Sequence, residues 1–590
     1  MVQEGYILDY ISGKEVKATP EEIEAVQVFS KQLVEDYGYK KGLIQTRPQF
    51  RVKARPSDTE KEYPVDIAIF EDTKKDDDNL FIIVECKQKN KKEGRKQLED
   101  YLRLSRAYLG VWFNGEERLF LRKIEEKGKV LFEEIPNIPK LGQRLEDIGK
   151  FKRADLKPTH NLKAIFKAIR NHLAGNTVGT TRDEPLAQQL INLIFCKIYD
   201  EKFTKREEIV EFRAGVGEDL EVINKRIFNI FDEVKNKYGD VIAFNEEITL
   251  DYSSIAYVVG ELQNYCLMDS ERDVIADAFE TFIGHALKGA QGQFFTPRNV
   301  IEMMVQILNP TEEHKIIDPA CGSGGFLIDS LRYVWRVIDK KAKDYSWNDR
   351  EILSEKQKVA VDNFRGIDKD SFLSKVTKAY MAIMGDGKGG IFCEDSLEKP
   401  SNWNSKTKSK IQLGAFDIVV TNPPFGSKIP VKGEEKLKQF ELGFKWKKDK
   451  TTGKWIKTNK IKEKESPQIL FIERCLELLK EDGRMGIVLP DGIYGNGKLG
   501  YIRQFILEKA QIIAVIDIPK ETFMPNTPTK TSLLFLRKLK VGEKLDDYPL
   551  FMATCKKCGH DRRGNSIPED DLKDISVNFH NWRKENGIRY

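Results

Sequence analysis

The sequence predicts a multidomain α/β chain whose largest domain is built on a parallel sheet. Residues 315–318 form an expected buried strand, which leads through the glycine-rich loop Asp318-Pro-Ala-Cys-Gly-Ser-Gly-Gly-Phe-Leu327 into a helix. Residues 416–420 form a second expected strand, which ends in the turn Asn422-Pro-Pro-Phe425. Strand ends of this kind meet at the carboxyl edge of a parallel sheet, where α/β folds bind ligands.

Length and composition exclude several classes of protein. The chain has 590 residues, too many for one hydrophobic core, so we expect about three or four domains. No apolar run approaches the ~20 residues that span a bilayer, so we expect no membrane partner. The N-terminus lacks a basic segment followed by an apolar run, as a secretory signal would require. Eight scattered cysteines suit a reducing environment, and we therefore expect a cytoplasmic protein.

One stretch concentrates positive charge, although the formal net charge is only +5. Lysines are dense between residues 428 and 464, with Phe444, Trp446 and Trp455 among them. This pattern is typical of a surface that follows nucleic-acid phosphates. It is equally typical of a solvated loop, and the sequence leaves both interpretations open.

Residues 1–150 are predicted to form a small α/β domain. Thr19-Pro-Glu-Glu22 marks the start of a helix that runs to about Tyr37 and is ended by Gly38. The remaining elements expected here are strands at residues 50–52, 65–70, 80–85 and 110–114 and a helix at residues 95–109.

Charged side chains gather at the ends of these strands. Asp66 lies near the start of one strand, whereas Glu85 and Lys87 lie two residues apart near the end of the next and share a face. The two carboxylates can hold Mg²⁺ through oxygen ligands. The lysine can orient an attacking water and stabilise charge on a phosphate. Gln97 and Tyr101, four residues apart, share one helix face.

This order of residues resembles the PD-(D/E)xK nucleases, in particular the N-terminal domain of type I restriction endonuclease subunits. The resemblance implies a Mg²⁺-dependent endonuclease whose site comprises Asp66, Glu85, Lys87, Gln97 and Tyr101. Asp66 and Glu85 would be the metal ligands, and a helix glutamate, either Glu22 or Glu24, would complete the site. The alternative is an inert domain that keeps the fold and binds DNA without cutting it.

Residues 151–275 are predicted to form an all-α helical domain. Apolar residues recur at helical spacing in residues 160–171, 186–199, 220–238 and 255–267. No catalytic combination of residues lies in these stretches. A further helix is expected at residues 275–286.

The third predicted domain, residues 276–590, carries polar residues at consecutive strand ends. Before the first strand, Gln293-Phe-Phe-Thr-Pro-Arg298 precedes a helix whose free N–H groups suit a carboxylate. Beyond the glycine loop a strand ends at Asp368, which can accept hydrogen bonds from ribose hydroxyls. A third strand ends at Asp395 and Ser396, and an acid at this position suits the exocyclic amine of adenine.

Together these motifs resemble the methylation subunit of type I restriction–modification systems, an N6-adenine DNA methyltransferase. The resemblance covers residues 155–560 approximately and implies a Rossmann-like domain that uses S-adenosylmethionine. It assigns cofactor binding to Gln293, Phe294, Phe295, Thr296, Pro297, Arg298, Asp318, Ala320, Gly322, Ser323, Gly324, Gly325, Asp368, Asp395 and Ser396.

The same resemblance assigns methyl transfer to Asn422, Pro423, Pro424 and Phe425. The target adenine must flip out of the duplex. The Asn422 side-chain oxygen and the Pro423 carbonyl can then accept both hydrogens of its N6 amine, while the rigid Pro-Pro holds these acceptors and Phe425 stacks on the base. An RNA or a protein amide is the alternative substrate. A DNA-binding scaffold that holds S-adenosylmethionine only as an effector is the alternative outside the enzymes.

The C-terminal residues bear on metals and partners. Cys555, Cys558 and His560 lack a convincing fourth ligand, so we expect no zinc site. About fifty residues follow Leu536, fewer than the ~100 of a typical domain, so a target-recognition domain is not expected there. A separate specificity subunit is therefore expected. The family resemblance implies double-stranded DNA as substrate, with a second copy of the chain and a restriction subunit as further partners.

Overall fold

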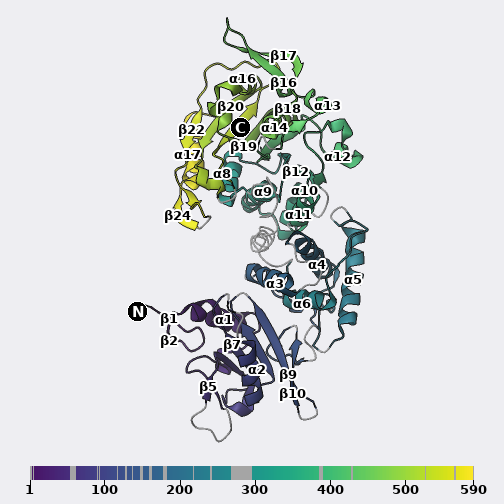
Figure 1. Cartoon of the computed structure of the whole chain (residues 1–590), viewed down its shortest axis with the longest axis vertical. Coiled ribbons are helices and arrows are strands. Elements are labelled where there is room, and N and C mark those ends of the chain that lie inside the picture. The colour runs from purple at the N-terminus through teal and green to yellow at the C-terminus, as the bar shows by residue number, and fades with distance from the viewer. Residues whose placement is uncertain are drawn as a thin grey trace. The chain divides into compact units, whose positions relative to one another are not determined.

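The computed structural model describes residue 3 and residues 5–53, 62–89, 91, 94–115, 117–126, 129–135, 137–145, 150–158, 162–176, 183–216, 218–239, 242–267, 296–383, 390–426, 429–524, 527–563 and 566–588. The chain divides into two compact units, Met1–Leu287 and Lys288–Tyr590 (Figure 1). Within the described residues, no helix has both the length and the apolar character needed to cross a membrane.

The first unit is built on a mixed sheet in the order β10-β9-β8-β7-β6-β3. Its strands are β3 (Ile44–Gln45), β6 (Ile67–Phe70), β7 (Leu80–Cys86), β8 (Leu109–Phe113), β9 (Arg118–Glu126) and β10 (Lys129–Ile135). β7 and β8 are parallel and are joined by helix α2 (Arg95–Leu104), whereas the other neighbours are antiparallel. Both faces of the sheet are covered by apolar clusters, which explains why every residue of β6 is buried.

Short elements surround this sheet. The N-terminal helix begins with a π-helical turn (Glu22–Val26) and continues as α1 (Gln27–Glu35). Two small hairpins are formed by β1 (Tyr6–Leu8) with β2 (Glu15–Lys17) and by β4 (Arg51–Lys53) with β5 (Glu62–Pro64). The helix predicted at residues 95–109 was too long, because α2 ends at Leu104 and Leu109 already belongs to β8.

The predicted helical stretches are confirmed within the first unit. They correspond to α3 (Leu162–Asn176), α4 (Asp183–Phe203), α5 (Leu220–Lys237) and α6 (Tyr252–Leu262). Asp219 and Asp251 cap α5 and α6 by accepting backbone N–H groups with their carboxylates. A buried ion pair, Arg118 Nε to Glu261 Oε2 at 3.3 Å, links α6 to β9. The helix predicted at residues 275–286 lies outside the described residues.

The second unit is built on a larger sheet in the order β13-β12-β11-β14-β19-β21-β20-β22. Its strands are β11 (Ile316–Asp318), β12 (Phe364–Asp368), β13 (Ile391–Cys393), β14 (Phe416–Thr421), β19 (Leu479–Pro490), β20 (Ala510–Asp517), β21 (Thr531–Lys538) and β22 (Phe551–Thr554). The strands from β13 to β19 are parallel, and only β21 runs antiparallel to its described neighbours. The chain leaves β11 in one direction to β12 and β13, then returns to the other side of β11 as β14. The β11–β14 junction is therefore a topological switch point.

Helices cover both faces of this sheet (Figure 1). They include α8 (Arg298–Leu308), α9 (Gly325–Tyr345), α10 (Asp349–Asn363), α11 (Ser371–Ile383), α14 (Pro467–Leu478), α16 (Gly500–Lys509) and α17 (Leu572–Glu585). A Cβ on Gly486 of β19 would meet Leu308 of α8 at 3.2 Å, so α8 packs closely on that face. Its neighbours Met485 and Ile487 point the other way, into the cluster formed with α14 and α16.

Between β14 and α14 the chain makes an excursion that we call the insert, residues 431–465. It contains β15 (Val431–Lys432), α13 (Glu434–Leu437), β16 (Phe444–Lys448), β17 (Trp455–Ile461) and β18 (Lys464–Glu465). β15 pairs with β18 at the base of the insert, and β16 pairs with β17 in a hairpin. After β22, the chain forms β23 (Cys558–His560) and β24 (Ser566–Asp570), which the Asn299 amide ties to α8.

Candidate functional site

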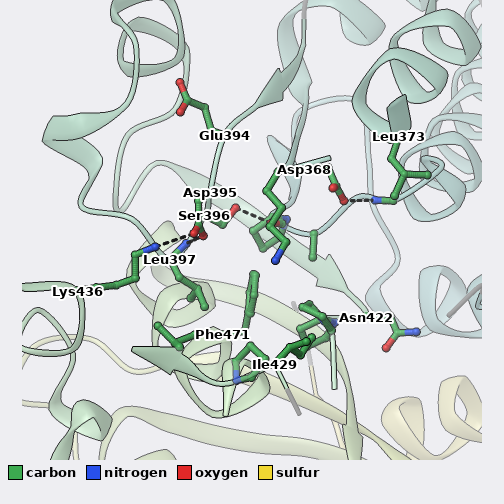
Figure 2. A pocket seen from close by; sticks show the side chains of 18 of the residues that line it. Asp368, Leu373, Glu394, Asp395, Ser396, Leu397, Asn422, Ile429, Lys436 and Phe471 are labelled. Carbon is green, nitrogen blue, oxygen red and sulfur yellow. Dashed lines mark hydrogen bonds and ion pairs between the residues drawn. The ribbon is translucent and has the colours of Figure 1, made fainter. Parts of the chain in front are cut away.

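A cavity of about 410 Å³ opens at the carboxyl ends of β11, β12, β13 and β14, at the switch point of the sheet (Figure 2). Its size is that of a small-molecule site. The residues predicted from the sequence that line it are Ala320, Gly322, Asp368, Asp395, Ser396, Asn422, Pro423 and Pro424. The structure therefore brings together residues that are up to about a hundred positions apart in the chain.

The glycine loop is tightly enclosed, as its sequence predicts. Gly322 and Gly324 have φ angles of 53° and 89°, which favour glycine. A Cβ on Gly324 would lie 2.7 Å from Thr377 Cγ2, and one on Gly325 would lie 2.8 Å from Ile301 Cδ1. The Thr377 hydroxyl also donates to the Gly322 carbonyl at 2.7 Å. At Gly324 and Gly325 the loop thus has room for backbone only, and α9 begins at Gly325.

Two acids hold this loop in place. Asp318 is fully buried, and its Oδ1 accepts the Ala320 N–H at 3.0 Å. Burial raises the pKa of Asp318 to about 7, although the Ala320 N–H and the Thr421 hydroxyl act in the opposite direction. Asp368 accepts the Gly322 N–H on Oδ2 at 2.9 Å and the Asp370 N–H on Oδ1 at 2.9 Å. Asp318 is not among the residues that line the cavity, whereas Asp368 is.

At the end of β13, Asp395 faces a lysine that the sequence did not reveal. Its Oδ2 accepts from Lys436 Nζ at 2.7 Å, and its Oδ1 accepts the Leu397 N–H at 2.9 Å (Figure 2). Lys436 belongs to α13 of the insert and itself lines the cavity. Beside this pair, the Ser396 hydroxyl donates to the Pro319 carbonyl at 2.5 Å and so ties β13 to the glycine loop.

At the end of β14, the Asn422 amide has a defined orientation. Asn422 Nδ2 donates to Thr296 Oγ1 at 2.9 Å, and Thr296 is buried. Asn422 Oδ1 is buried too and has no hydrogen-bond partner among the residues that the structure describes. The nitrogen is engaged and the oxygen remains available, so this amide presents an acceptor next to the cavity.

The remaining residues of the two predicted motifs differ in their positions. Phe425 is buried and does not line the cavity, where Phe471 of α14 stands instead. Thr296 does not cap a helix, because α8 begins at Arg298 after Pro297 and the Thr296 hydroxyl contacts Asn422. Arg298 forms an ion pair with Glu302 at 3.3 Å. Gln293, Phe294 and Phe295 lie outside the described residues.

A second group of predicted residues comes together in the first unit, at the ends of β6 and β7. Asp66 Oδ2 accepts the Cys86 N–H at 2.7 Å, and its Oδ1 accepts from Gln49 at 3.2 Å. Burial raises the pKa of Asp66 to about 6. Burial, together with the charge of Asp66, raises the pKa of Glu85 to about 7. Lys87 Nζ forms an ion pair with Glu85.

The two predicted residues of α2 lie against this group. Gln97 donates to the Tyr101 hydroxyl at 2.6 Å. The pKa of Tyr101 is raised by burial and, to a smaller extent, by the charges of Glu85 and Asp66. The five residues that the sequence singled out are therefore linked, with Gln97 joined to the others through Tyr101.

The helix acid whose charge acts on this group is Glu21, which the sequence did not single out. Of the two glutamates that the resemblance offered, Glu22 is held by Arg47 at 2.5 Å and Gln27 at 2.7 Å. The other, Glu24, has a buried Oε2 with no hydrogen-bond partner among the described residues. The negative charge of Glu21 instead raises the pKa values of Asp66 and Glu85. Glu21 directly precedes the π-helical turn, and such a turn shifts the faces expected from a regular helix.

The arrangement of acidic, cysteine and histidine side chains shows where a metal ion could bind. In the described part of the chain, no group of three or more His, Cys, Asp or Glu side chains is arranged to hold a metal ion. Asp66 and Glu85 still fit a divalent cation as a pair, because two buried carboxylates raise each other's energy when ionised. Cys555 and Cys558 instead contact the carbonyls of Lys557 and His560, and His560 Nε2 contacts the carbonyl of Glu521.

Comparison with known families separates the two sites. A model described as "N-6 DNA Methylase" matches residues 270–589, which include the cavity at the switch point. A model described as "Type I restriction enzyme R protein N terminus (HSDR_N)" matches residues 20–139, which include the group around Asp66.

Individual proteins show the same likeness. The EcoEI methylase subunit of a type I restriction enzyme from Escherichia coli is 25% identical over 411 residues, 64% of this chain and 75% of that protein. The MjaVII methylase subunit from Methanocaldococcus jannaschii is 25% identical over 441 residues, 72% of this chain and 69% of that protein. Among solved structures, a modification subunit of a putative type I restriction enzyme from Vibrio vulnificus YJ016 is 17% identical, with a TM-score of 0.49 over 72% of this chain and 91% of that one.

Proposed function

Because the chain belongs to the N-6 DNA methylase family and is therefore an adenine-specific DNA methyltransferase, we propose that it is the modifying subunit of a type I restriction–modification system. In this proposal it methylates the N6 amine of a flipped adenine with S-adenosylmethionine as methyl donor. The observation that carries the proposal is the Asn422 amide, whose nitrogen is engaged by Thr296 and whose oxygen is available beside the cavity.

Asn422 acts on the amine of the target base. Its Oδ1 accepts one N6 hydrogen, and the Pro423 carbonyl accepts the other. These two hydrogen bonds would pull the amine hydrogens out of the plane of the base. The nitrogen then becomes more tetrahedral, and its lone pair is available as the nucleophile. The contact with Thr296 keeps the amide from turning its N–H₂ group toward the amine, an orientation in which two donors would face each other.

The glycine loop and the aspartates at the strand ends make the cavity suitable for the methyl donor. S-adenosylmethionine supplies an electrophilic methyl group on a sulfonium when it is bound. The glycine loop, which has no room for a Cβ at Gly324 or Gly325, lets the backbone lie close to it. Asp368 would accept hydrogen bonds from its ribose hydroxyls, and Asp395 would accept one from its adenine amine. Asp318 acts indirectly, by holding Ala320 in the loop.

The first unit supports a second activity, Mg²⁺-dependent cleavage of DNA. Asp66 and Glu85 would hold the cation, and Lys87 would orient the attacking water and stabilise charge on the phosphate. The observation that favours this activity is that Asp66, Glu85 and Lys87 lie together at the ends of β6 and β7. Burial raises the pKa of both carboxyl groups there, and a bound divalent cation would offset their negative charge. The alternative is that this unit binds DNA without cutting it.

The proposed partners follow from the proposed activity. The substrate is duplex DNA, and a separate specificity subunit selects the site, together with a second copy of this chain and a restriction subunit. All eight cysteines are free thiols, which suits the reducing cytoplasm where such DNA would be found.

One experiment tests both activities. Duplex DNA, labelled S-adenosylmethionine and Mg²⁺ are incubated with the chain, with and without the protein encoded beside it. We expect label on adenine N6, lost in Asn422→Ala, and strand cleavage, lost in Asp66→Ala. An Asn422→Ala variant with undiminished methyl transfer would refute the assigned role. Label without any cleavage would leave the first unit as a binding domain, and label that requires the neighbouring protein would support a separate specificity subunit.

A further inference from the structure

The β16–β17 hairpin carries a concentration of charge that methyl transfer does not use. Residues 444–461 include seven lysines and a single acid, Asp449. The Asp449 carboxylate accepts the N–H groups of Thr451 and Thr452 in the turn, where it closes the hairpin. In Figure 1 the hairpin projects beyond the sheet of the second unit. This segment therefore presents a strongly positive surface.

One face of the hairpin is anchored to the body of the second unit. The rings of Trp446 and Trp455 both lie 5.8 Å from that of Tyr501 on α16. Gln504 of α16 accepts the Trp455 N–H at 2.7 Å and donates to the Trp455 carbonyl at 2.8 Å. The Trp446 indole donates to the Glu441 carbonyl at 3.2 Å. These contacts fix the hairpin, unlike the solvated loop that the sequence also allowed.

The opposite face is exposed and basic. Strand alternation places Lys445 and Lys447 of β16 on this face, and Lys447 pairs with Ile456 of β17. Lys460 of β17 is exposed beyond the irregular part of the register. The three lysines are exposed and have no ion-pair partner among the described residues, and Ile456 is 54% exposed. By contrast, Lys457 on the anchored face pairs with Glu441 at 3.3 Å. The positive charge on this outer face is therefore not neutralised by acidic side chains among the described residues.

The base of the insert that carries the hairpin is part of the cavity wall. Ile429, Val431, Lys432 and Lys436 line the cavity where the chain enters the insert, and Pro467 lines it where the chain returns. β15 and β18 pair across this base, with Val431 opposite Glu465. A duplex that delivers a base to the cavity therefore meets the same insert whose outer end is the basic hairpin.

We propose that the outer face of the β16–β17 hairpin binds the phosphate backbone of the duplex whose adenine enters the cavity. This inference rests on the proposed function, since it assumes that the cavity receives a DNA base. The charged groups on this face are all lysines, which act as point charges on phosphates and do not offer the bidentate fork with which arginine reads guanine. The hairpin therefore contributes affinity and position without selecting a sequence.

The test compares two variants that lose the same charge. The first combines Lys445→Gln, Lys447→Gln and Lys460→Gln on the hairpin. The control combines Lys340→Gln, Lys343→Gln and Lys358→Gln, three exposed lysines of α9 and α10. Affinity of the whole chain for a short fluorescent duplex is measured by anisotropy over a range of KCl concentrations. Binding of labelled S-adenosylmethionine and methyl transfer at saturating DNA are measured in parallel.

We expect the hairpin variant to bind DNA roughly tenfold or more weakly at low salt, and equally so for any sequence. The slope of log affinity against log salt should fall by about 0.9 for each phosphate that the lysines no longer neutralise. The control should behave as the unmodified chain does, and cofactor binding should be unchanged in both variants. Salt slopes that match between the hairpin variant and the control would overturn the inference. So would an unmodified chain that does not bind duplex DNA, or a hairpin variant that loses only its assembly with a partner protein.

The outcomes also separate this inference from the proposed function. A chain without methyl transfer whose DNA affinity still depends on the hairpin lysines would refute the function and leave the DNA-binding surface standing. A hairpin variant with normal DNA affinity in a chain that methylates adenine would refute the surface and leave the function.

Discussion

The orientation of a single amide governs the proposed chemistry at the scale of residues. We predict that Thr296→Val lowers the rate of methyl transfer by roughly 10- to 100-fold, because a catalytic group without its positioning partner spends little time in the productive orientation. The affinity for S-adenosylmethionine should change little. Labelled methyl transfer and calorimetric binding measure the two quantities. Thr296→Ser keeps the hydroxyl and should retain activity, so a Thr296→Val enzyme as fast as Thr296→Ser would contradict the role.

Asp318 offers a second residue-scale prediction, on stability. Its pKa is raised from 3.8 to about 7 in the folded chain. Between these two values the folded state binds more protons than the unfolded state, so the Asp318 contribution to stability is present at low pH and is lost as pH rises to 7. We predict that Asp318→Asn stabilises the second unit by roughly 2 to 4 kcal/mol at pH 8 and has little effect at pH 4. Urea unfolding at both pH values measures this, and equal effects at the two would contradict the assignment.

The sequence predicted the site residues that directly follow a strand, but not the residues that contact them from distant parts of the chain. Asp368, Asp395 and Asn422 could be predicted because each directly follows a recognisable strand. Lys436 could not, because it meets Asp395 from an insert 41 residues further along. The contact of Thr296 with Asn422 spans 126 residues and depends on how α8 packs beside β14. Only the tertiary fold brings such pairs together.

At the scale of elements, the glycine loop gives a matched pair of substitutions. We predict that Gly324→Ala destabilises the second unit by about 2 kcal/mol or more, for two reasons. Alanine would be strained in the left-handed backbone conformation, and its Cβ would lie only 2.7 Å from Thr377 Cγ2. Gly322→Ala introduces only the backbone strain, because nothing lies within 4 Å of the added Cβ, and it should lower the stability by about 1 kcal/mol. Unfolding curves of both variants measure the difference. A Gly322→Ala chain as unstable as Gly324→Ala would show that steric contact is not the cause.

The type of a helix or strand was easier to predict from the sequence than its first and last residues. The fold class and the long amphipathic helices are confirmed by the structure. Helix α2 was predicted five residues too long, because its apolar pattern continues into β8, where Leu109 starts the strand. Strands β9 and β10 were not predicted from the sequence, since their alternation of charged and apolar residues becomes informative only once they pair with each other beside β8. Local spacing cannot reveal a pairing partner.

At the scale of the whole molecule, buried charge links the helical part of the first unit to its sheet. We predict that Arg118→Met, which leaves Glu261 buried without its partner, destabilises this unit by about 3–5 kcal/mol. The double variant Arg118→Met with Glu261→Met should recover most of the loss, because neither member of this ion pair is then left buried without its partner. Hydrogen exchange of peptides from β9 and α6 measures the local stability. A double variant no more stable than the single one would contradict the role of the ion pair.

The way in which the insert joins the second unit has an evolutionary consequence. Both of its ends meet where β15 pairs with β18, so the excursion begins and ends at nearly the same place. Lengthening, shortening or replacing the hairpin beyond this point leaves the path of β14 and α14 unaltered, and closing a longer excursion costs little extra entropy. The β16–β17 hairpin therefore has the properties of an exchangeable cassette, through which related chains can diversify their outer surface, while Lys436 at the base of the insert keeps its place in the cavity wall.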